Sequence, residues 1–344
     1  MSQIRYSHNK PTLGFEEINA VRRTLESGQV SQGPQVEAFE NELCEFFHLD
    51  YGHTAVVSSG SAALYLALKL FSSSKRDIGL PVYSCAALRN AIGLVNANPI
   101  YIDCGHSDPN LDLISGTQNT LFGIIAPSMY GLPLDLKFIK KPNFIIEDIA
   151  QSFGARVNGT PIGLRGDVGI CSFYATKMFT SGGQGGAIIS RDKAIIDEVK
   201  DYRLFDNRDD SKLRFNFQMT DTQAAIGRVQ LSRLPEFISR RSNIFSIYKE
   251  GGLKLMDTAC NSFESVKYRA IIITKYQTSL IKKLQNLGVN AIIPISKNEL
   301  LDKPQNYPNA LKLTQEAVSL PIYPTLKEKD AQLILSYINS CLEY

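Results

Sequence analysis

Short apolar runs rich in β-branched and aromatic residues alternate with helical patterns through the first two thirds of this chain. Between these runs, residues 61–70 and 86–95 carry apolar side chains at helical spacing. This alternation predicts an α/β fold, with a mostly parallel sheet whose strands are joined by crossover helices. The expected strands lie at residues 55–57, 99–102, 121–126, 144–146 and 168–173.

The pattern changes from about Asp221 onward. A long helical stretch is interrupted at Pro235, an apolar run follows at 268–273, and a last helix is expected near 329–344. With 344 residues, the chain also exceeds the usual size of one domain. We therefore predict a large cofactor-binding domain over residues 1–235 and a smaller C-terminal α/β domain over 236–344.

Charge and hydropathy argue against several classes of protein. The 37 basic and 34 acidic residues give a net charge of +3 and are mixed along the chain, which does not favour nucleic-acid binding. We find neither a secretory signal nor the ~20 apolar residues that span a bilayer, so we expect a cytoplasmic protein. The cysteines lack the spacing of a metal site, and we expect buried free thiols: Cys44, Cys85, Cys104, Cys171, Cys260 and Cys341.

The segment around Asp148 reads as a buried strand that delivers an acid at its carboxyl end. Open α/β sheets bind ligands at this end of their strands. A carboxylate here suits pyridoxal phosphate, because a negative charge beside the ring nitrogen keeps it protonated and lets the ring accept electrons. Taken alone, Asp148 is equally compatible with the cap of a helix.

Lys177 follows the next apolar run and precedes a glycine-rich segment at 181–187. Desolvation beside a buried strand weakens the preference of a lysine for its charged form, so that it condenses with an aldehyde. Nearby glycines let the backbone approach a flat cofactor. Considered singly, a lysine is more often a surface residue, and a glycine loop is more often a turn.

A possible phosphate site lies at residues 57–64, where an expected strand ends in small residues and a helix begins. The free N–H groups and positive dipole of a helix amino terminus attract phosphate. An ordinary serine-capped helix is the alternative. The segment matches neither a Walker loop nor a dinucleotide-binding motif.

Four motifs follow one another along the chain, and together they indicate a function more specifically than each does singly. They are the phosphate turn, the strand-end aspartate, the Ser-Phe-x-x-x-Lys motif and the paired glycines. The chain resembles the DegT-type family of sugar aminotransferases, which are fold-type I pyridoxal-phosphate enzymes. The similarity runs over nearly the whole sequence. Its other matching segments are residues 27–34, 39–40, 216–219, 223–225 and 319–322.

The resemblance implies a reaction and three roles at the cofactor ring. An amino group would pass from glutamate to a keto group of a nucleotide-linked deoxysugar, in deoxyamino-sugar and polysaccharide biosynthesis. Lys177 would be the Schiff-base lysine and the proton carrier, and Asp148 would pair with the pyridine nitrogen. Gln151 would lie against the ring or its 3-hydroxyl.

The resemblance also implies a phosphate site and a homodimer. Gly60, Ser61 and Ser172 would hold the phosphate of the cofactor. Asn216 would reach the phosphate of the neighbouring subunit's cofactor, which implies shared active sites.

Several positions depart from the family pattern. Cys85 stands where an aromatic residue is common, Ser128 replaces a histidine, and Met178 replaces an asparagine. These departures support an alternative, a non-catalytic regulatory or binding protein that keeps the fold. A sugar dehydratase of the same family is a second alternative, although such enzymes typically replace the Schiff-base lysine and Lys177 argues against it.

Overall fold

The computed structural model describes residues 4–71, 75–112, 120–139, 142–258 and 261–342. Its main sheet has seven strands in the order β1-β11-β10-β7-β6-β2-β3. Five are near the expected runs, namely β1 (Thr54–Val57), β3 (Asn98–Ile102), β6 (Gly123–Pro127), β7 (Phe144–Asp148) and β10 (Val168–Ser172). The remaining strands, β2 (Asp77–Pro81) and β11 (Gly186–Ile189), lie outside the predicted set.

The directions of the strands confirm a mostly parallel α/β sheet. Neighbours from β10 through β7, β6 and β2 to β3 are parallel. In contrast, β11 is antiparallel to both of its neighbours, β1 and β10. The central strands are almost entirely buried, as expected when helices cover both faces of a sheet.

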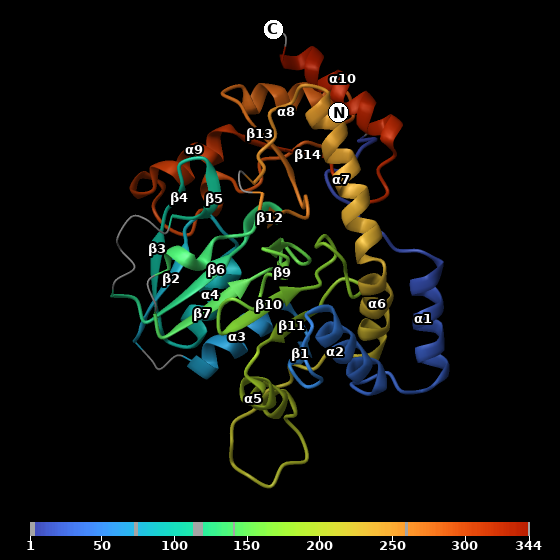
Figure 1. Ribbon diagram of the computed structural model, residues 1–344, viewed down its shortest axis with the longest axis vertical. Helices are drawn as coiled ribbons and strands as arrows, with labels where there is room; N and C mark the ends of the chain where they lie inside the picture. Colours follow the sequence, from blue (N-terminus) through green and yellow to red (C-terminus); the bar gives the residue numbers. More distant parts are fainter. Residues whose placement is uncertain (1–3, 72–74, 113–119, 140–141, 259–260, 343–344) are drawn as a thin grey trace.

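Helices cover both faces of this sheet (Figure 1), and its buried side chains belong to three hydrophobic clusters, of which two are large. Successive side chains of β1 alternate between them, because strand residues point to opposite faces: Ala55 and Val57 belong to one core and Val56 to the other. The first core includes α3 (Gly60–Phe71), α4 (Ala86–Leu94) and α5 (Lys193–Arg203). The second includes α2 (Pro34–Phe46) and α6 (Asp221–Ser232), and α1 (Phe15–Glu26) packs on α6.

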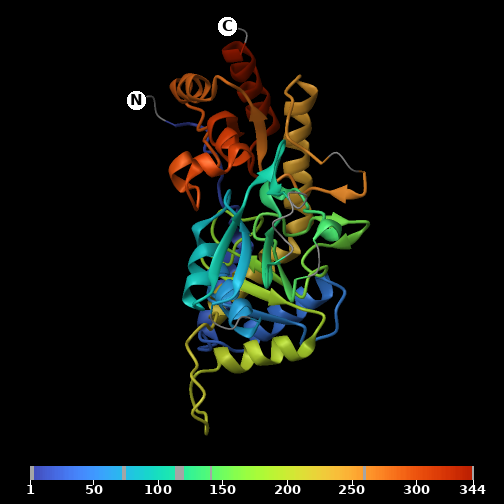
Figure 2. The same ribbon diagram turned by 90° about the vertical axis from the view of Figure 1, so that its left-hand side faces the viewer.

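A separate core forms around the antiparallel strands β13 (Ala270–Ile273) and β14 (Ala317–Leu320). Three helices pack on it, α7 (Leu234–Glu250), α8 (Gln277–Asn286) and α10 (Glu328–Leu342). Figures 1 and 2 show this part above the main sheet, with α7 running between the two. The predicted division at residue 235 lies near the start of α7, and it stays a prediction.

The remaining elements are short strands, one helix and single 3₁₀ turns. The short strands are β4 (Cys104–Gly105), β5 (Asp108–Leu111), β8 (Arg156–Val157), β9 (Thr160–Pro161) and β12 (Phe263–Glu264). The remaining helix is α9 (Pro308–Glu316), and single 3₁₀ turns occur at η2 (Met129–Gly131), η3 (Leu136–Phe138), η4 (Lys297–Glu299) and η5 (Pro304–Asn306).

The cysteines only partly match the expectation of buried thiols. Among the described residues, Cys44, Cys104 and Cys171 are buried and free. Cys85 is exposed and Cys341 is partly exposed, so burial was wrong for these two; Cys85 lies at the start of α4, where its side chain faces away from the core. Cys260 lies outside the described residues. Across the described chain, no helix combines the length and apolar character needed to span a membrane.

A buried ion pair fastens two helices to β1. Glu40 on α2 is 6% exposed and Arg203 on α5 is 4% exposed. A carboxylate oxygen of Glu40 accepts a hydrogen bond from Arg203 at 2.5 Å and another from the backbone N–H of Val56 at 3.0 Å. Lys200 contacts the other carboxylate oxygen at 2.8 Å. The carboxylate thus ties α2 and α5 to the strand that leads into the expected phosphate turn.

We expect Glu40→Gln to destabilise the protein strongly, because it leaves the buried charge of Arg203 uncompensated. Breaking one partner of such a pair costs about 3–5 kcal/mol. The control is Asp197→Asn, which breaks the exposed Lys193–Asp197 pair and should cost only about 0.3–0.5 kcal/mol. Urea unfolding of the cofactor-free proteins measures both losses. Equal losses in the two variants would contradict the anchoring role.

Candidate active site

The strand directions bring the predicted motifs to one edge of the main sheet. β7 and β10 are parallel neighbours, and β1 runs in the same direction as β10 because both are antiparallel to β11. The carboxyl ends of these strands therefore share an edge. Asp148 ends β7, Lys177 follows β10, and the turn through Ser59 follows β1. Motifs distant in sequence thus meet where α/β sheets bind ligands.

The turn after β1 forms the amino terminus of α3. The Ser59 hydroxyl accepts the N–H of Ala62 at 3.1 Å, and the Ser59 carbonyl accepts the N–H of Ala63 at 3.0 Å. Gly60 and Ser61 begin the helix, so their N–H groups have no acceptor within it. Such a terminus attracts an anion.

Ser172, the last residue of β10, packs directly against this turn. A Cβ atom at Gly60 would lie 2.7 Å from the Cβ of Ser172, so glycine is needed for the close approach. The exposed Ser61, the half-buried Ser172 and Gly60 therefore lie together, and they fit a phosphate group.

Asp148 is a buried acid, 8% exposed. One of its oxygens accepts the N–H of Ala150 at 2.9 Å, and the described residues offer it no ion-pair partner within 4.0 Å. Burial raises the pKa of this carboxyl, against the opposing effects of the Ala150 N–H and the positive charge of Lys177. A buried carboxylate of this kind fits the protonated ring nitrogen of pyridoxal phosphate.

Gln151 is held by the segment beyond β6. Its side-chain oxygen accepts the N–H of Tyr130 at 3.0 Å, and its amide nitrogen lies 3.7 Å from the sulfur of Met129. Tyr130 is buried and has a left-handed backbone, with φ +63° and ψ +9°. Non-glycine residues adopt this conformation at a cost, and such strain concentrates at functional sites.

Two departures from the family pattern have structural roles. The buried Ser128 accepts the N–H of Leu134 at its hydroxyl, 3.1 Å away, and the hydroxyl of Ser152 at its carbonyl, 2.6 Å away. Met178 is 2% exposed within the core that contains α2 and α6. These two residues therefore support the backbone around Asp148 and Lys177.

Tyr268 lies within electrostatic reach of Lys177 and had no sequence signal. Tyr268 is 6% exposed. Burial opposes ionisation of this phenol, but the charges of Lys177, Arg269 and Arg241 together hold its pKa below the ordinary value. The run at 268–273 was recognised only as a strand, and nothing in it indicated that Tyr268 or Arg269 would lie near the predicted lysine.

The N-terminal segment reaches the same loop. The N–H groups of Arg5 and Tyr6 bond the carbonyl of Gly288, beside the small sheet. Farther along, the Asn9 amide donates to the carbonyl of Thr176 at 2.8 Å. Asn9 therefore links the N-terminal segment to the residue before Lys177. No local sequence motif predicted this contact.

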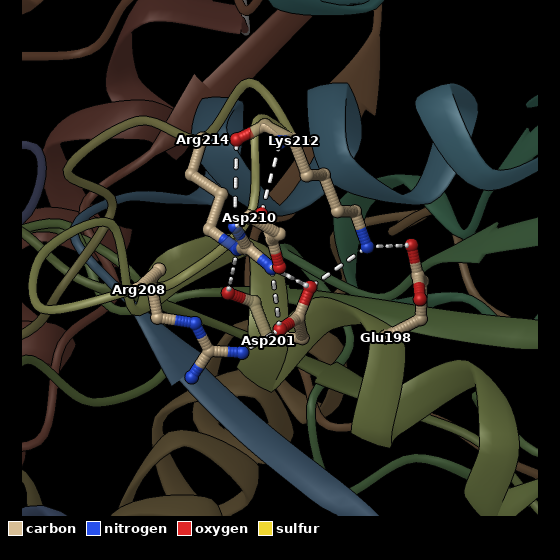
Figure 3. A network of polar contacts seen from close by, with 6 residues as sticks. All are labelled: Glu198, Asp201, Arg208, Asp210, Lys212 and Arg214. Carbon is tan, nitrogen blue, oxygen red and sulfur yellow. Dashed lines mark hydrogen bonds and ion pairs between the residues drawn. The ribbon is translucent and has the colours of Figure 1, made fainter.

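Asn216 follows a loop that a network of ion pairs holds to α5 (Figure 3). The Arg214 side chain is 4% exposed and lies between Asp201 and Asp210, at 3.0 and 2.6 Å. Lys212 adds contacts to Asp201 and to Glu198. The network thereby fixes the end of the loop against α5.

Beyond this network, Phe217 accepts the N–H of Ser58 at its carbonyl, 2.8 Å away. Asn216 is exposed, and its side-chain oxygen accepts the N–H of Gln218 at 3.1 Å. The chain thus places Asn216 beside its own phosphate turn, and a role toward a neighbouring subunit stays a prediction. The described residues contain no cluster of side chains suited to a metal ion.

The sheet, the helix terminus, the buried acid and the lysine together define a fold-type I aminotransferase. The chain belongs to the DegT/DnrJ/EryC1/StrS aminotransferase family, whose pattern matches residues 11–339. Enzymes of this family use pyridoxal phosphate. Membership rules against the non-catalytic alternative.

Comparisons with known proteins agree with this assignment. GDP-perosamine synthase of Escherichia coli O157:H7 is 29% identical over 354 residues, covering 96% of each chain. The dTDP-3-amino-3,4,6-trideoxy-alpha-D-glucose transaminase of Streptomyces venezuelae is 26% identical over 356 residues, covering 96% of this chain and 93% of that protein. The aminotransferase TlmJ of Streptoalloteichus hindustanus shares the fold, with a TM-score of 0.91, 24% identity, and coverage of 98% and 99%.

We expect Asp148→Asn to stabilise the cofactor-free protein at neutral pH. Because burial raises the folded-state pKa of Asp148, its contribution to stability is fully present below the unfolded carboxyl pKa of about 4 and is lost as pH rises through the folded pKa. The asparagine amide does not ionise, so the variant does not lose stability in this way as pH rises. The melting temperature of the variant at pH 7 should exceed that of wild type by a few degrees. This difference in melting temperature should disappear near pH 4.

Thermal scans across pH measure this effect, with the exposed Asp50→Asn as control. If the variant were less stable than wild type at pH 7, the charge of Asp148 would stabilise the cofactor-free fold. It would then not be a destabilising charge that needs a cationic ligand.

Proposed function

We propose that this sugar aminotransferase transfers the amino group of glutamate to a keto group of a nucleotide-linked deoxysugar. The observation that carries the proposal is the buried Asp148, which has no ion-pair partner among the described residues and lies at the sheet edge shared with Lys177. Relatives named for GDP-linked and dTDP-linked amino sugars support the class of acceptor. The glutamate donor rests on the family resemblance.

The proposed roles divide between proton transfer and electronic control. Bound pyridoxal phosphate supplies a ring that withdraws electrons from the substrate carbon. Asp148 holds the proton on the ring nitrogen, because its buried carboxylate gains a cationic partner there. The amine of Lys177 would hold the cofactor and would carry the proton between the substrate carbon and the cofactor.

Other residues hold the cofactor in place. The N–H groups of Gly60 and Ser61, with the hydroxyl of Ser172, hold its phosphate at the positive end of α3. Gln151 lies against the ring, and its own bond to the Tyr130 N–H fixes its orientation.

We expect borohydride reduction of the cofactor-saturated protein to leave the cofactor attached to Lys177. Peptide mapping by mass spectrometry identifies the labelled lysine, with Lys177→Arg as the control that should carry no label.

Asp148→Asn should keep the label and lose about 10²-fold or more in the rate with glutamate, since a neutral partner no longer holds the ring proton. Product masses from a panel of nucleotide keto-sugars then test the acceptor. Label on another lysine would reject the assignment, and dehydrated rather than aminated products would favour the dehydratase.

We also propose a homodimer with shared active sites. The loop before Asn216 exposes large apolar side chains, with Leu213 at 84% and Phe215 at 65% exposure. Its ion-pair network keeps these side chains outward, as a partner subunit would require. In a twofold dimer each Asn216 would serve the partner's phosphate site.

Mixed dimers test this arrangement. Lys177→Ala and Asn216→Ala chains should each be poorly active alone. If Asn216 acts across the interface, their heterodimer has one site with both defects and one with neither, and should recover about half of the wild-type activity. If Asn216 serves only its own chain, each site keeps one defect and activity stays low. Co-purification with two tags verifies the heterodimer, and circular dichroism verifies its folding.

A further inference from the structure

The N-terminal strap, residues 4–12, runs from the small sheet to the loop of the candidate lysine. The N–H of Tyr6 donates to the carbonyl of Gly288 at 3.0 Å. The ring of His8 lies 2.7 Å from the hydroxyl of Ser319, which is fully buried on β14. The strap is therefore anchored beside the small sheet before it reaches the lysine.

The next residue of the strap, Asn9, binds the lysine loop, residues 173–181, at the peptide group before Lys177. Its amide donates to the carbonyl of Thr176 at 2.8 Å, and this carbonyl carbon is bonded to the backbone nitrogen of Lys177. That nitrogen donates to the carbonyl of Tyr174 at 3.0 Å. Both polar groups of the peptide unit are thus hydrogen-bonded. Among the described residues, the Thr176 carbonyl receives its hydrogen bond from Asn9 alone.

The end of the strap and the end of the lysine loop meet at one buried side chain. Gln230 on α6 is 1% exposed. Its amide nitrogen donates to the carbonyl of Thr12 at 2.7 Å, and its side-chain oxygen accepts the N–H of Thr180 at 3.3 Å. Residues 10–12 of the strap and 177–180 of the loop also line one small cavity. The strap therefore borders the loop on both sides of the lysine.

The orientation of the peptide group before Lys177 decides where its amine can reach. Rotation of this group changes the direction in which the side chain leaves the backbone. The four-carbon stem of a lysine is flexible, so any freedom in the backbone spreads the amine over more positions. Attack on a bound aldehyde requires the reacting atoms to be close and aligned. A hydrogen bond that fixes this peptide group therefore favours the reaction of the lysine.

We propose that Asn9 is a positioning residue that aims the amine of Lys177 at the aldehyde carbon of bound pyridoxal phosphate. In that step the neutral amine adds to the aldehyde, a C=N bond forms and one water molecule leaves. The inference rests on the proposed role of Lys177, but it does not depend on the sugar or on the amino donor. Because the strap is anchored beside the small sheet, that sheet takes part in placing the lysine.

The test measures the affinities of cofactor-free protein for two forms of the cofactor. Pyridoxal phosphate bonds to Lys177, whereas pyridoxamine phosphate has no aldehyde and binds through non-covalent contacts alone. The variants are Asn9→Ala and Asn9→Asp; the second keeps the shape of the side chain and its acceptor for the Lys10 N–H, but it has no donor. The control is Ser7→Ala, at an exposed position of the strap. Absorbance and fluorescence titrations give the dissociation constants.

In both Asn9 variants the dissociation constant for pyridoxal phosphate should rise about 3- to 10-fold, the loss expected for one hydrogen bond. The dissociation constant for pyridoxamine phosphate should match that of wild type, and the control should match wild type for both forms. In a Lys177→Ala background, Asn9→Ala should no longer change the affinity for pyridoxal phosphate, because the amine that it positions is absent. Backbone amides of the lysine loop should exchange hydrogen faster in cofactor-free Asn9→Ala.

Three outcomes overturn the inference. Unchanged affinity for pyridoxal phosphate in both Asn9 variants would leave Asn9 without this role. An equal loss for the two cofactor forms, whether or not the variant folds, would make Asn9 a structural residue of the whole site. A loss that persists in the Lys177→Ala background would show that Asn9 acts on the cofactor without the lysine.

Failure of the proposed function gives a different result. Borohydride would then leave no label on Lys177 of the wild-type protein, and the inference would fall with the function. If Lys177 of the wild-type protein is labelled and the Asn9 variants bind both cofactor forms as wild type does, the proposed function stands and only the inference is rejected.

Discussion

The common direction of β1, β7 and β10 is the constraint on which the rest of the site depends. It arises because β11 is antiparallel to both of its neighbours, so that β1 ends at the same edge as the parallel strands. Hydrophobic burial on both faces holds these strands in place, and the Glu40–Arg203 pair ties β1 to two helices. With β1 reversed, the turn at Gly60 would open at the opposite edge of the sheet, away from Asp148 and Lys177.

Charged residues that support the fold have ion-pair partners, whereas two charged residues at the candidate site have none in the described chain. Glu40 and Arg214 are buried or covered, and each has its counter-charge within 3.0 Å. In contrast, Asp148 and Arg269 lack such partners in the described chain, although burying an unpaired charge is unfavourable. This pattern is expected where ligands supply the missing charge. We therefore expect the free protein to be less stable than the protein with its ligands bound.

Family membership establishes the type of chemistry more firmly than it does the substrate. Ser128 and Met178 differ from the common pattern, yet both serve the backbone around the site rather than an open surface. We propose that the chemistry resides in Lys177, Asp148 and the turn at Gly60. A shared fold carries no information on the identity of the sugar.

Local sequence patterns determined the α/β class and the motifs at Asp148, Lys177 and Gly60, because apolar periodicity and strand-end residues are encoded by near neighbours. They did not reveal β2 and β11, whose short segments acquire strand pairing from distant partners. Only the tertiary structure brought Tyr268 within electrostatic reach of Lys177 and joined Asn9 to Thr176. These contacts join residues far apart in the chain, so their physical cause is the packing of the small sheet and the N-terminal segment against the large sheet, which no local pattern records.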